Sequence, residues 1–317
     1  MATTTTPSTR LSSLPPAAGR AGLRGVLASE LTKLRSVRST YWTLAMLFLF
    51  SVGISAAATA GTAASFHNNP ENKAGFDATQ VSLIAFFEIG QLIIAILGAM
   101  AITSEYSTGM VRTSLTAMPR RGVVYAAKAI VFTFVTLIFS VITSFIAFFA
   151  GQAMLSGTGV AASLFHTVTI PANAIFNGPG PKGGGPGSGP GTVTFQGTDV
   201  IHASTVLGAI IGSALFVTVV ALIAFGVGSI IRHTAGAIFT VIGMMFVIPI
   251  IVQAALPNDW KWDIVRFMPD SAGRVMSVTV GAANPHLWSY WPQFLVTAIY
   301  AAVLLGVGAY LFRKRDA

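Results

Sequence analysis

Residues 129–153 read AIVFTFVTLIFSVITSFIAFFAGQA, a long run without a single charged side chain. A helix needs about 20 consecutive apolar residues to cross the hydrocarbon core of a bilayer. This stretch exceeds that length, so a helix built from it can tilt or protrude from the bilayer. It therefore predicts a transmembrane helix.

Charge-poor stretches of similar length occur five more times, at 41–63, 81–103, 204–231, 235–255 and 291–312. Only the second span, 81–103, contains a charge, Glu88. Overall, 53% of the residues are hydrophobic and 9% are charged, whereas soluble domains carry roughly 25% charged residues. We expect an all-α polytopic membrane protein with about six transmembrane helices, and we exclude the soluble class.

The basic residues predict how the spans are oriented. Six crossings place both termini on one side, and cytoplasmic loops carry an excess of Lys and Arg. Of the 19 Lys and Arg residues, all but five fall on the side of the termini; the five are Lys73, Lys182, Lys261, Arg266 and Arg274. Both termini are therefore predicted to be cytoplasmic in a multi-pass protein of the cell membrane. The same distribution explains the net charge of +9 through contact with anionic lipid, without a nucleic-acid partner.

We expect a six-span domain at 41–317, with two segments before it, 1–21 and 22–40, and two external segments within it. Residues 1–21 are rich in Thr, Ser and Pro and predict a disordered cytoplasmic tail. The external loop 155–200 contains the flexible Gly/Pro-rich stretch GPGPKGGGPGSGPG. The external segment 256–290 carries Trp and Phe side chains and predicts a short amphipathic piece on the outer interface.

Residues 22–40 predict an amphipathic helix lying in the headgroup plane before the first span. Leucines and a valine recur there every three or four residues and form one apolar stripe: Leu23, Leu27, Leu31, Leu34 and Val37. Glu30 and Arg38 fall close to this stripe, so we expect their charged ends to reach for water.

Enzymatic motifs are missing from the sequence. It has no H-E-x-x-H, no G-x-S-x-G and no G-x-x-x-x-G-K-[ST], and it contains no cysteine. Its five histidines are scattered over loops and span ends. We therefore expect no catalytic residues, no metal site, no cofactor and no nucleotide site on this chain.

The cytoplasmic stretch 104–122, between the second and third spans, is the most informative part. It predicts a short helix on the membrane face, with Glu105 at its start, where the helix dipole favours a carboxylate. Gly109 would let another backbone approach closely, and Pro119 would end the helix. An ordinary basic loop remains the alternative, because membrane anchoring alone explains Arg120, Arg121 and a following lysine.

These residues strongly resemble the permease subunits of type-2 ATP-binding-cassette (ABC) exporters. The shared pattern is a carboxylate leaving the second span, a glycine four residues later, Arg-Thr-x-Leu, and Pro-Arg-Arg before the next span. In that family the stretch is the coupling helix, which docks into a groove on the ATPase subunit. The resemblance assigns this coupling role to Glu105, Gly109, Arg112, Pro119, Arg120 and Arg121.

Two further segments match the same family: the helix around Ser29–Arg35, and Leu256–Gly273 before the last span. The Gly/Pro-rich external loop does not match. The resemblance implies an exporter permease that works with a separate ATPase subunit and forms a homo- or heterodimer of permeases. An ion-gradient-driven secondary transporter and a non-transporting scaffold are the alternatives; a secondary transporter usually has ionisable groups in several spans.

Glu88 and Gln91 share one helical face of the second span. A charge inside a bilayer is costly and usually faces the bundle interior or a water-filled path, which suggests a polar patch on the translocation pathway. Equally, Glu88 can lie near the external end of its span and simply reach water.

Overall fold

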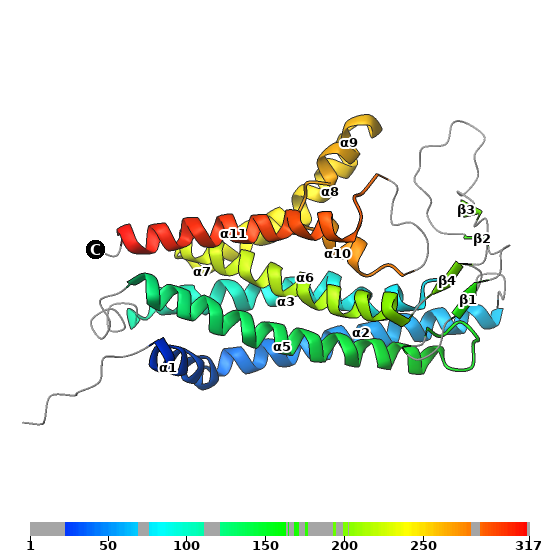
Figure 1. Cartoon of the computed structure of the whole chain (residues 1–317), viewed down its shortest axis with the longest axis horizontal. Helices are drawn as coiled ribbons and strands as arrows, with labels where there is room; N and C mark the ends of the chain where they lie inside the picture. Colours follow the sequence, from blue (N-terminus) through cyan, green and yellow to red (C-terminus); the bar gives the residue numbers. More distant parts are fainter. Residues whose placement is uncertain are drawn as a thin grey trace, which may run out of the picture.

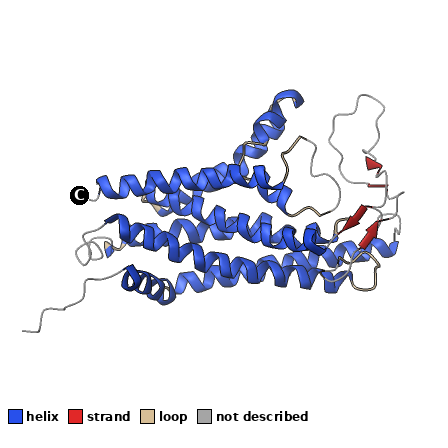
Figure 2. Cartoon of the chain, in the orientation of Figure 1, coloured by secondary structure: helices blue, strands red, loops and turns tan. Residues whose placement is uncertain are grey.

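A computed structural model describes residues 23–68, 76–110, 121–162, 164, 168–170, 175–176, 193–194, 199–201, 203–279 and 286–315. These residues form a bundle of long helices that run along one axis (Figure 1; Figure 2). Six helices among them are long and apolar enough to cross a membrane, which confirms the six predicted spans. In order, the spans are α2 (Arg38–Asn68), α3 (Ala78–Ser107), α5 (Arg121–Leu155), α6 (Ala203–Ile231), the succession α7 (Thr234–Ile242), η2 (Gly243–Val247) and α8 (Ile248–Ala255), and α11 (Tyr290–Arg315).

α3 extends beyond its apolar stretch because a polar residue caps its start. The Asp77 carboxylate accepts hydrogen bonds from the backbone N–H groups of Thr79 and Gln80, which begins α3 before its apolar run. α5 has 35 residues and, at about 1.5 Å per residue, is about 50 Å long. It therefore exceeds the hydrocarbon thickness, as its sequence predicts.

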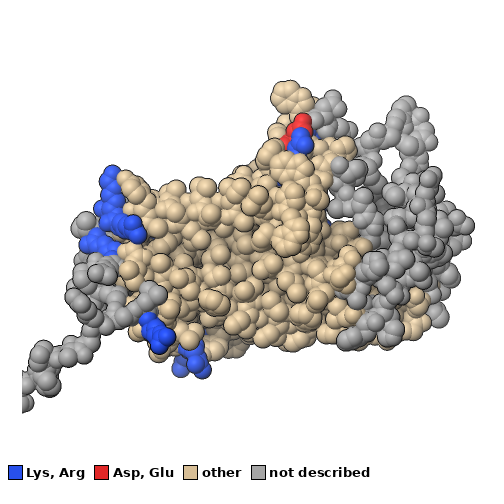
Figure 3. Space-filling model, viewed as in Figure 1, with Lys and Arg blue, Asp and Glu red and all other residues tan. Residues whose placement is uncertain are grey.

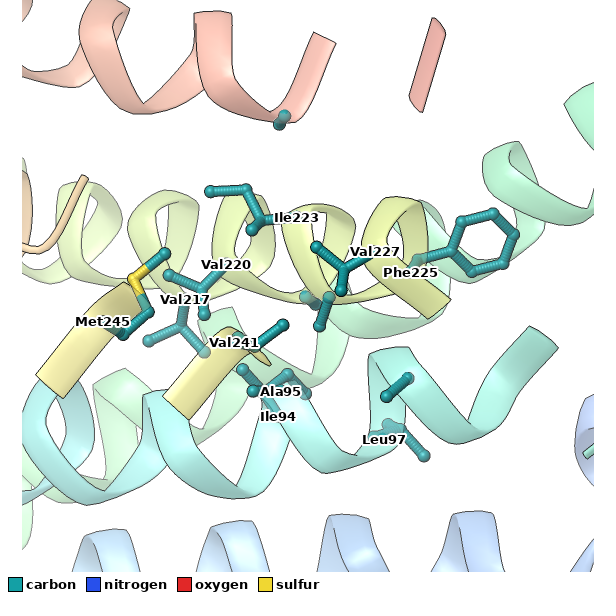
Figure 4. Close-up of a cluster of buried hydrophobic side chains, with 14 of the residues drawn as sticks. Ile94, Ala95, Leu97, Val217, Val220, Ile223, Phe225, Val227, Val241 and Met245 are labelled. Atoms are coloured by element: carbon teal, nitrogen blue, oxygen red, sulfur yellow. The ribbon is translucent and has the colours of Figure 1, made fainter. Parts of the chain in front are cut away.

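α6 lies at the centre of the bundle and packs against α3, α11, α5 and α7. In Figure 4, Ile94 of α3, Val217 and Val220 of α6, and Val241 and Met245 of the fifth span meet in one cluster of buried apolar side chains. Of the six spanning helices, α3 and α6 are the most buried inside the bundle, and the fifth span and α11 are the least buried.

Small residues allow the two central helices to approach closely. A Cβ added at Gly98 of α3 would collide with the backbone oxygen of Ala221 in α6. A Cβ at Gly228 of α6 would meet the backbone oxygen of Ala99 at 3.0 Å. The glycines of α3 and α6 therefore set the distance between these helices.

The fifth span is irregular and leads into the segment 256–290. η2 is a π-helical turn inside it, and Pro249 follows at the start of α8. α8 and α9 (Asn258–Val265) project away from the other helices, and α10 (Ser271–Met276) returns to pack on α11 and α6 (Figure 1). The segment 256–290 thus contains two short helices, α9 and α10.

Short strands interrupt the predicted loop between α5 and α6. β1 (Val168–Ile170) pairs antiparallel with β4 (Asp199–Ile201), and β2 (Ile175–Phe176) pairs with β3 (Val193–Thr194). They lie at the end of the bundle opposite the C-terminus (Figure 1). The Gly/Pro-rich stretch between β2 and β3 is outside the described residues, as is the tail before α1.

The helix before the first span, α1 (Leu23–Ser36), packs on α5 and α2 at the end of the bundle where the C-terminus also lies (Figure 1). Lys and Arg side chains gather at this end in the face shown in Figure 3, whereas the middle of that face shows none. We call it the basic end; its described basic residues are Arg24, Lys33, Arg35, Arg38, Arg121, Lys128, Arg232, Arg313 and Lys314.

Candidate functional site

Three of the predicted coupling residues, Glu105, Gly109 and Arg121, lie at the basic end, around the connection between α3 and α5. Arg112, Pro119 and Arg120 are outside the described residues, and Arg121 is the first residue of α5. Glu105 lies in the last turn of α3. The prediction that Glu105 begins a separate helix is therefore wrong, because α3 continues past its apolar run as far as Ser107.

Gly109 has a conformational reason to be glycine. Its φ is +71°, a left-handed backbone conformation that side chains with a Cβ adopt at a cost. Its N–H donates to the carbonyl of Tyr106, so the chain turns out of α3 at this residue. A Cβ added there would meet no described atom within 4 Å, so no described backbone makes the close approach expected from the sequence.

Four charged side chains from three helices meet beside Gly109, and we call them the charge cluster: Glu30 and Lys33 of α1, Glu105 of α3, and Lys128 of α5. The Lys128 Nζ lies 2.6 Å from Glu30 Oε2 and 2.5 Å from Glu105 Oε1. The Lys33 Nζ lies 2.7 Å from Glu30 Oε1 and 3.8 Å from Glu105 Oε1. The cluster therefore joins α1 to both helices that flank the loop 108–120.

Burial makes these contacts strong and mutually dependent. Glu30 is 2% exposed and Lys128 is 7% exposed. Burial alone would raise the pKa of Glu30, but the ammonium groups of Lys128 and Lys33 outweigh it and hold that pKa below the ordinary 4.5. Two acids and two bases balance each other, so the cluster is stable only as a complete set.

The position of Glu30 corrects the expectation for the amphipathic helix. Glu30 does not reach for water; it lies on the α1 face that packs on the bundle, together with Val26. Leu31 and Val37 of the predicted apolar stripe are 40% and 43% exposed. These two residues of the stripe therefore face away from the protein, and the acidic residue next to the stripe makes the internal contact.

A second connection joins the end of α3 to the turn between α6 and α7. The Thr103 and Thr234 hydroxyl groups lie 2.8 Å apart, and the Arg232 guanidinium lies 4.9 Å from the centre of the Tyr106 ring. Arg232 has a φ of +61°, an uncommon conformation for a residue with a side chain, and its Nη2 donates to the Leu311 carbonyl of α11. The last turns of α3 thus contact α1, α5, α7 and the α6–α7 turn.

Glu88 and Gln91, the predicted pathway residues, lie toward the opposite end of α3. The Glu88 side chain is 36% exposed, and its Oε1 lies 3.8 Å from Arg274 Nη2 of α10. Gln91 is 1% exposed. The structure brings both residues next to Asp270 and Arg274 of the segment 256–290, which the sequence did not indicate as pathway residues.

Asp270 is the most buried charge of this group, with 7% of its surface exposed. Its Oδ2 accepts a hydrogen bond from Arg274 Nε at 3.3 Å. Burial raises the pKa of Asp270 above the ordinary 3.8, and the Arg274 guanidinium offsets part of this.

Asp270 and Arg274 also line a cavity of about 340 Å³, which we call the outer pocket. α3 contributes Gln80 to its wall, and α8 contributes Pro249 and Gln253. A smaller cavity of about 220 Å³ lies at the basic end, beside Lys33, Glu105 and Lys128 of the charge cluster. Within the described part of the chain, no three His, Asp or Glu side chains gather in a way that could hold a metal ion.

Part of the chain matches a known protein family. Residues 26–176 match the model of a family described as ABC-2 family transporter protein. This part of the chain is similar to ABC-2 transporters. No curated protein matches the chain.

The ABC-2 match covers α1, α2, α3 and α5, and with them every member of the charge cluster. It confirms the resemblance inferred from the stretch around Glu105 and Gly109. Asp270 and Arg274 of the outer pocket lie beyond the matched residues, as do α6, the fifth span and α11. The six apolar helices and the ABC-2 match together make the protein a multi-pass membrane protein.

The sequence contained weak signals for the residues that were missed. Glu30 and Lys33 have the i, i+3 spacing of a helical ion pair, and Asp270 and Arg274 have the i, i+4 spacing. Neither spacing predicts the third partner, which comes from a different helix in each case: Lys128 for the first pair and Glu88 for the second.

Two substitutions of Gly109 test whether its backbone conformation, and not a side-chain contact, requires a glycine at the end of α3. Gly109→Val should loosen the end of α3 by about 1–2 kcal/mol, because a β-branched residue resists a positive φ. Gly109→Asn should be close to neutral, because asparagine tolerates this conformation and the site is open. Hydrogen exchange at the amides of residues 104–110 measures the difference. Equal protection in both variants would mean that the backbone conformation does not set the residue at this position.

Proposed function

We propose that the chain is the permease subunit of an ABC exporter in the cell membrane, driven by a separate ATPase subunit. One observation carries the proposal beyond the family match: the charge cluster ties α1 to both helices that flank the loop 108–120. A force applied to this loop would therefore act on α1, α3 and α5 together. A loop with no task beyond joining two spans would not need such a connection.

The orientation follows from the same end of the molecule. The basic end gathers Lys and Arg residues from α1, α5, α11 and the α6–α7 turn (Figure 3). The positive-inside rule places this end in the cytoplasm, where an ATPase subunit can reach the loop. The tail 1–21 would then be cytoplasmic, and the loop 155–200 and the segment 256–290 external.

α1 fits the position of an in-plane helix in this orientation. Its bundle-facing side holds Glu30 in the charge cluster, while Leu31 and Val37 are exposed and available to lipid. The charge cluster would hold one face of α1 to the bundle while the other face contacts lipid. α1 would therefore move together with the loop 108–120 at the membrane surface.

The coupling mechanism assigns different tasks to the predicted residues. Glu105 holds α3 to Lys128 and so passes movement on within the subunit. Gly109 allows the turn out of α3, while Arg112, Pro119, Arg120 and Arg121 would present the docking surface. Two such subunits, identical or paralogous, would complete the transporter, with Glu88 and Gln91 on the translocation path.

Reversing one charge in the loop tests the docking role. Arg120→Glu is expected to reduce the ATPase subunit recovered with the tagged chain from detergent-solubilised membranes by about fivefold or more, because like charges would then face each other or a salt bridge would be lost. Lys314→Glu makes the same change at the exposed end of α11 and should leave recovery unchanged.

Both variants must insert at wild-type levels, which the amount of chain in the membrane fraction reports. Wild-type recovery of the ATPase subunit with Arg120→Glu and with a second loop variant, Gly109→Trp, would remove the docking role. If no ATPase subunit is recovered even with the unmodified chain, the proposal of a separate ATPase partner fails.

A further inference from the structure

The outer pocket has the size and position of a binding site for a small molecule. Its volume of about 340 Å³ falls at the lower end of the range for small-molecule sites, about 300–1,000 Å³. Its wall is assembled from the start of α3, from α8 and from the segment containing α9 and α10. It therefore lies at the end of the bundle opposite the charge cluster, beside the outer ends of two spans.

The charges around the outer pocket favour a positively charged ligand. A single guanidinium, Arg274, is shared by two carboxylates: Asp270 at 3.3 Å and Glu88 at 3.8 Å. Asp270 lines the pocket although only 7% of its surface is exposed. Among Arg274, Asp270 and Glu88, one cation is opposed by two anions, which leaves an excess negative charge at this part of the wall.

The remaining walls are those of a site for an amphipathic molecule. Val265, Met268 and Val275 supply apolar surface, and the amides of Gln80 and Gln253 supply polar contacts. Trp262 lines the pocket as well, and the chain's own Lys261 ammonium lies 5.2 Å from the centre of its ring. Lys261 is not among the lining residues, and a tryptophan ring can attract the ammonium group of a ligand in the same way.

We propose that the outer pocket binds an amphipathic organic cation, an amine or quaternary ammonium group joined to an apolar body. Its charged group contacts Asp270, and its apolar body lies against Met268, Val265 and the Trp262 indole. Resting on the transport function proposed above, this assigns organic cations as the class of substrate that the permease releases on the external side. Glu88, 3.8 Å from the same guanidinium, extends the negative wall along α3 toward Gln91.

An organic anion fits this pocket less well. Arg274 is the only basic residue in the lining, and both Asp270 and Glu88 already compensate its charge. An anion would have to separate Arg274 from these carboxylates and leave the buried Asp270 without a partner, which is costly. A cation needs no such separation, because a carboxylate has several acceptor sites and Arg274 occupies only part of them.

The test is a fluorescence titration of the purified full chain in nanodiscs of zwitterionic lipid, with ethidium as the aromatic cation and anilinonaphthalene sulfonate as the aromatic anion. Asp270→Asn should weaken ethidium binding about tenfold, the loss expected for a hydrogen bond to a charged group. Arg274→Gln should strengthen it by about threefold, because the carboxylates lose their internal counter-ion. Opposite effects of neighbouring substitutions are not expected from a merely structural role.

Two further variants control for the change of charge and for folding. Asp263→Asn removes a carboxylate from α9, 64% exposed and outside the pocket lining, and should leave ethidium binding unchanged. Gln253→Trp fills the pocket without changing the charge and should abolish saturable binding. Because Gln253 is exposed on α8, this variant should fold even if Asp270→Asn does not.

Ethidium binding that is the same in wild type, Asp270→Asn and Gln253→Trp would overturn the proposal. So would saturable binding of the anion that Arg274→Gln abolishes, because the pocket would then be an anion site. The titration uses the isolated chain and needs no ATPase subunit. Its failure is therefore distinguishable from failure of the ATPase pull-down.

Discussion

Replacing Lys128 with methionine is expected to detach α1 from the bundle and to lower stability more than any other single change at the basic end. The substitution keeps the volume of the side chain but removes the ammonium group that lies 2.6 Å from Glu30 and 2.5 Å from Glu105. Breaking a buried ion pair in this way costs about 3–5 kcal/mol, because the remaining charge is left buried. Lys33 still contacts both carboxylates, so we expect the lower end of that range.

Two measurements check the Lys128 prediction. The melting temperature of Lys128→Met in detergent should fall, and hydrogen exchange should accelerate across α1. Lys314→Met is the matched control, because it removes an exposed lysine from the same end of the bundle and should change neither quantity. The double variant Glu30→Gln with Lys128→Met should recover part of the loss, since it removes a buried acid together with its base. Equal melting temperatures for Lys128→Met and Lys314→Met would show that the charge cluster does not hold α1.

Gly98→Leu is expected to disrupt the packing of α3 on α6, with a loss of about 3 kcal/mol or more in stability. Even a single Cβ at this position would collide with the backbone oxygen of Ala221 and lie 2.9 Å from the Cβ of Ala224. The obstacle is the α6 backbone, which cannot rotate away as a side chain can. The helices would have to separate, and the cluster around Ile94 and Val220 would separate with them (Figure 4).

Gly53→Leu provides the control for the Gly98 prediction. Gly53 is also inside a spanning helix, but a Cβ there meets nothing within 4 Å, so leucine should be neutral or stabilising through its higher helix propensity. Melting temperature and monodispersity in detergent distinguish the two variants. A Gly98→Leu variant as stable as Gly53→Leu would mean that α3 and α6 are farther apart than the structure places them.

Most of the membrane architecture was predictable from local sequence. The six apolar stretches became six spanning helices, and α3 begins a few residues before its predicted limit because Asp77 caps it. The resemblance to ABC-2 transporters, inferred in part from the stretch 104–122, agrees with the family match over residues 26–176. The position of Glu105 was predicted wrongly, because α3 ends at the turn around Gly109 and not at the end of its apolar run.

The sequence by itself determined which segments span the membrane and which end of the bundle is basic. Each spanning helix satisfies its own backbone hydrogen bonds, so length and hydropathy are enough to specify it without reference to its neighbours. Only the tertiary structure decided that Glu30 meets Lys128, 98 residues away, and that Glu88 meets Arg274. Such contacts depend on the order and rotation of packed helices. An apolar helix that can face lipid on one side and protein on the other carries little information about that rotation in its sequence.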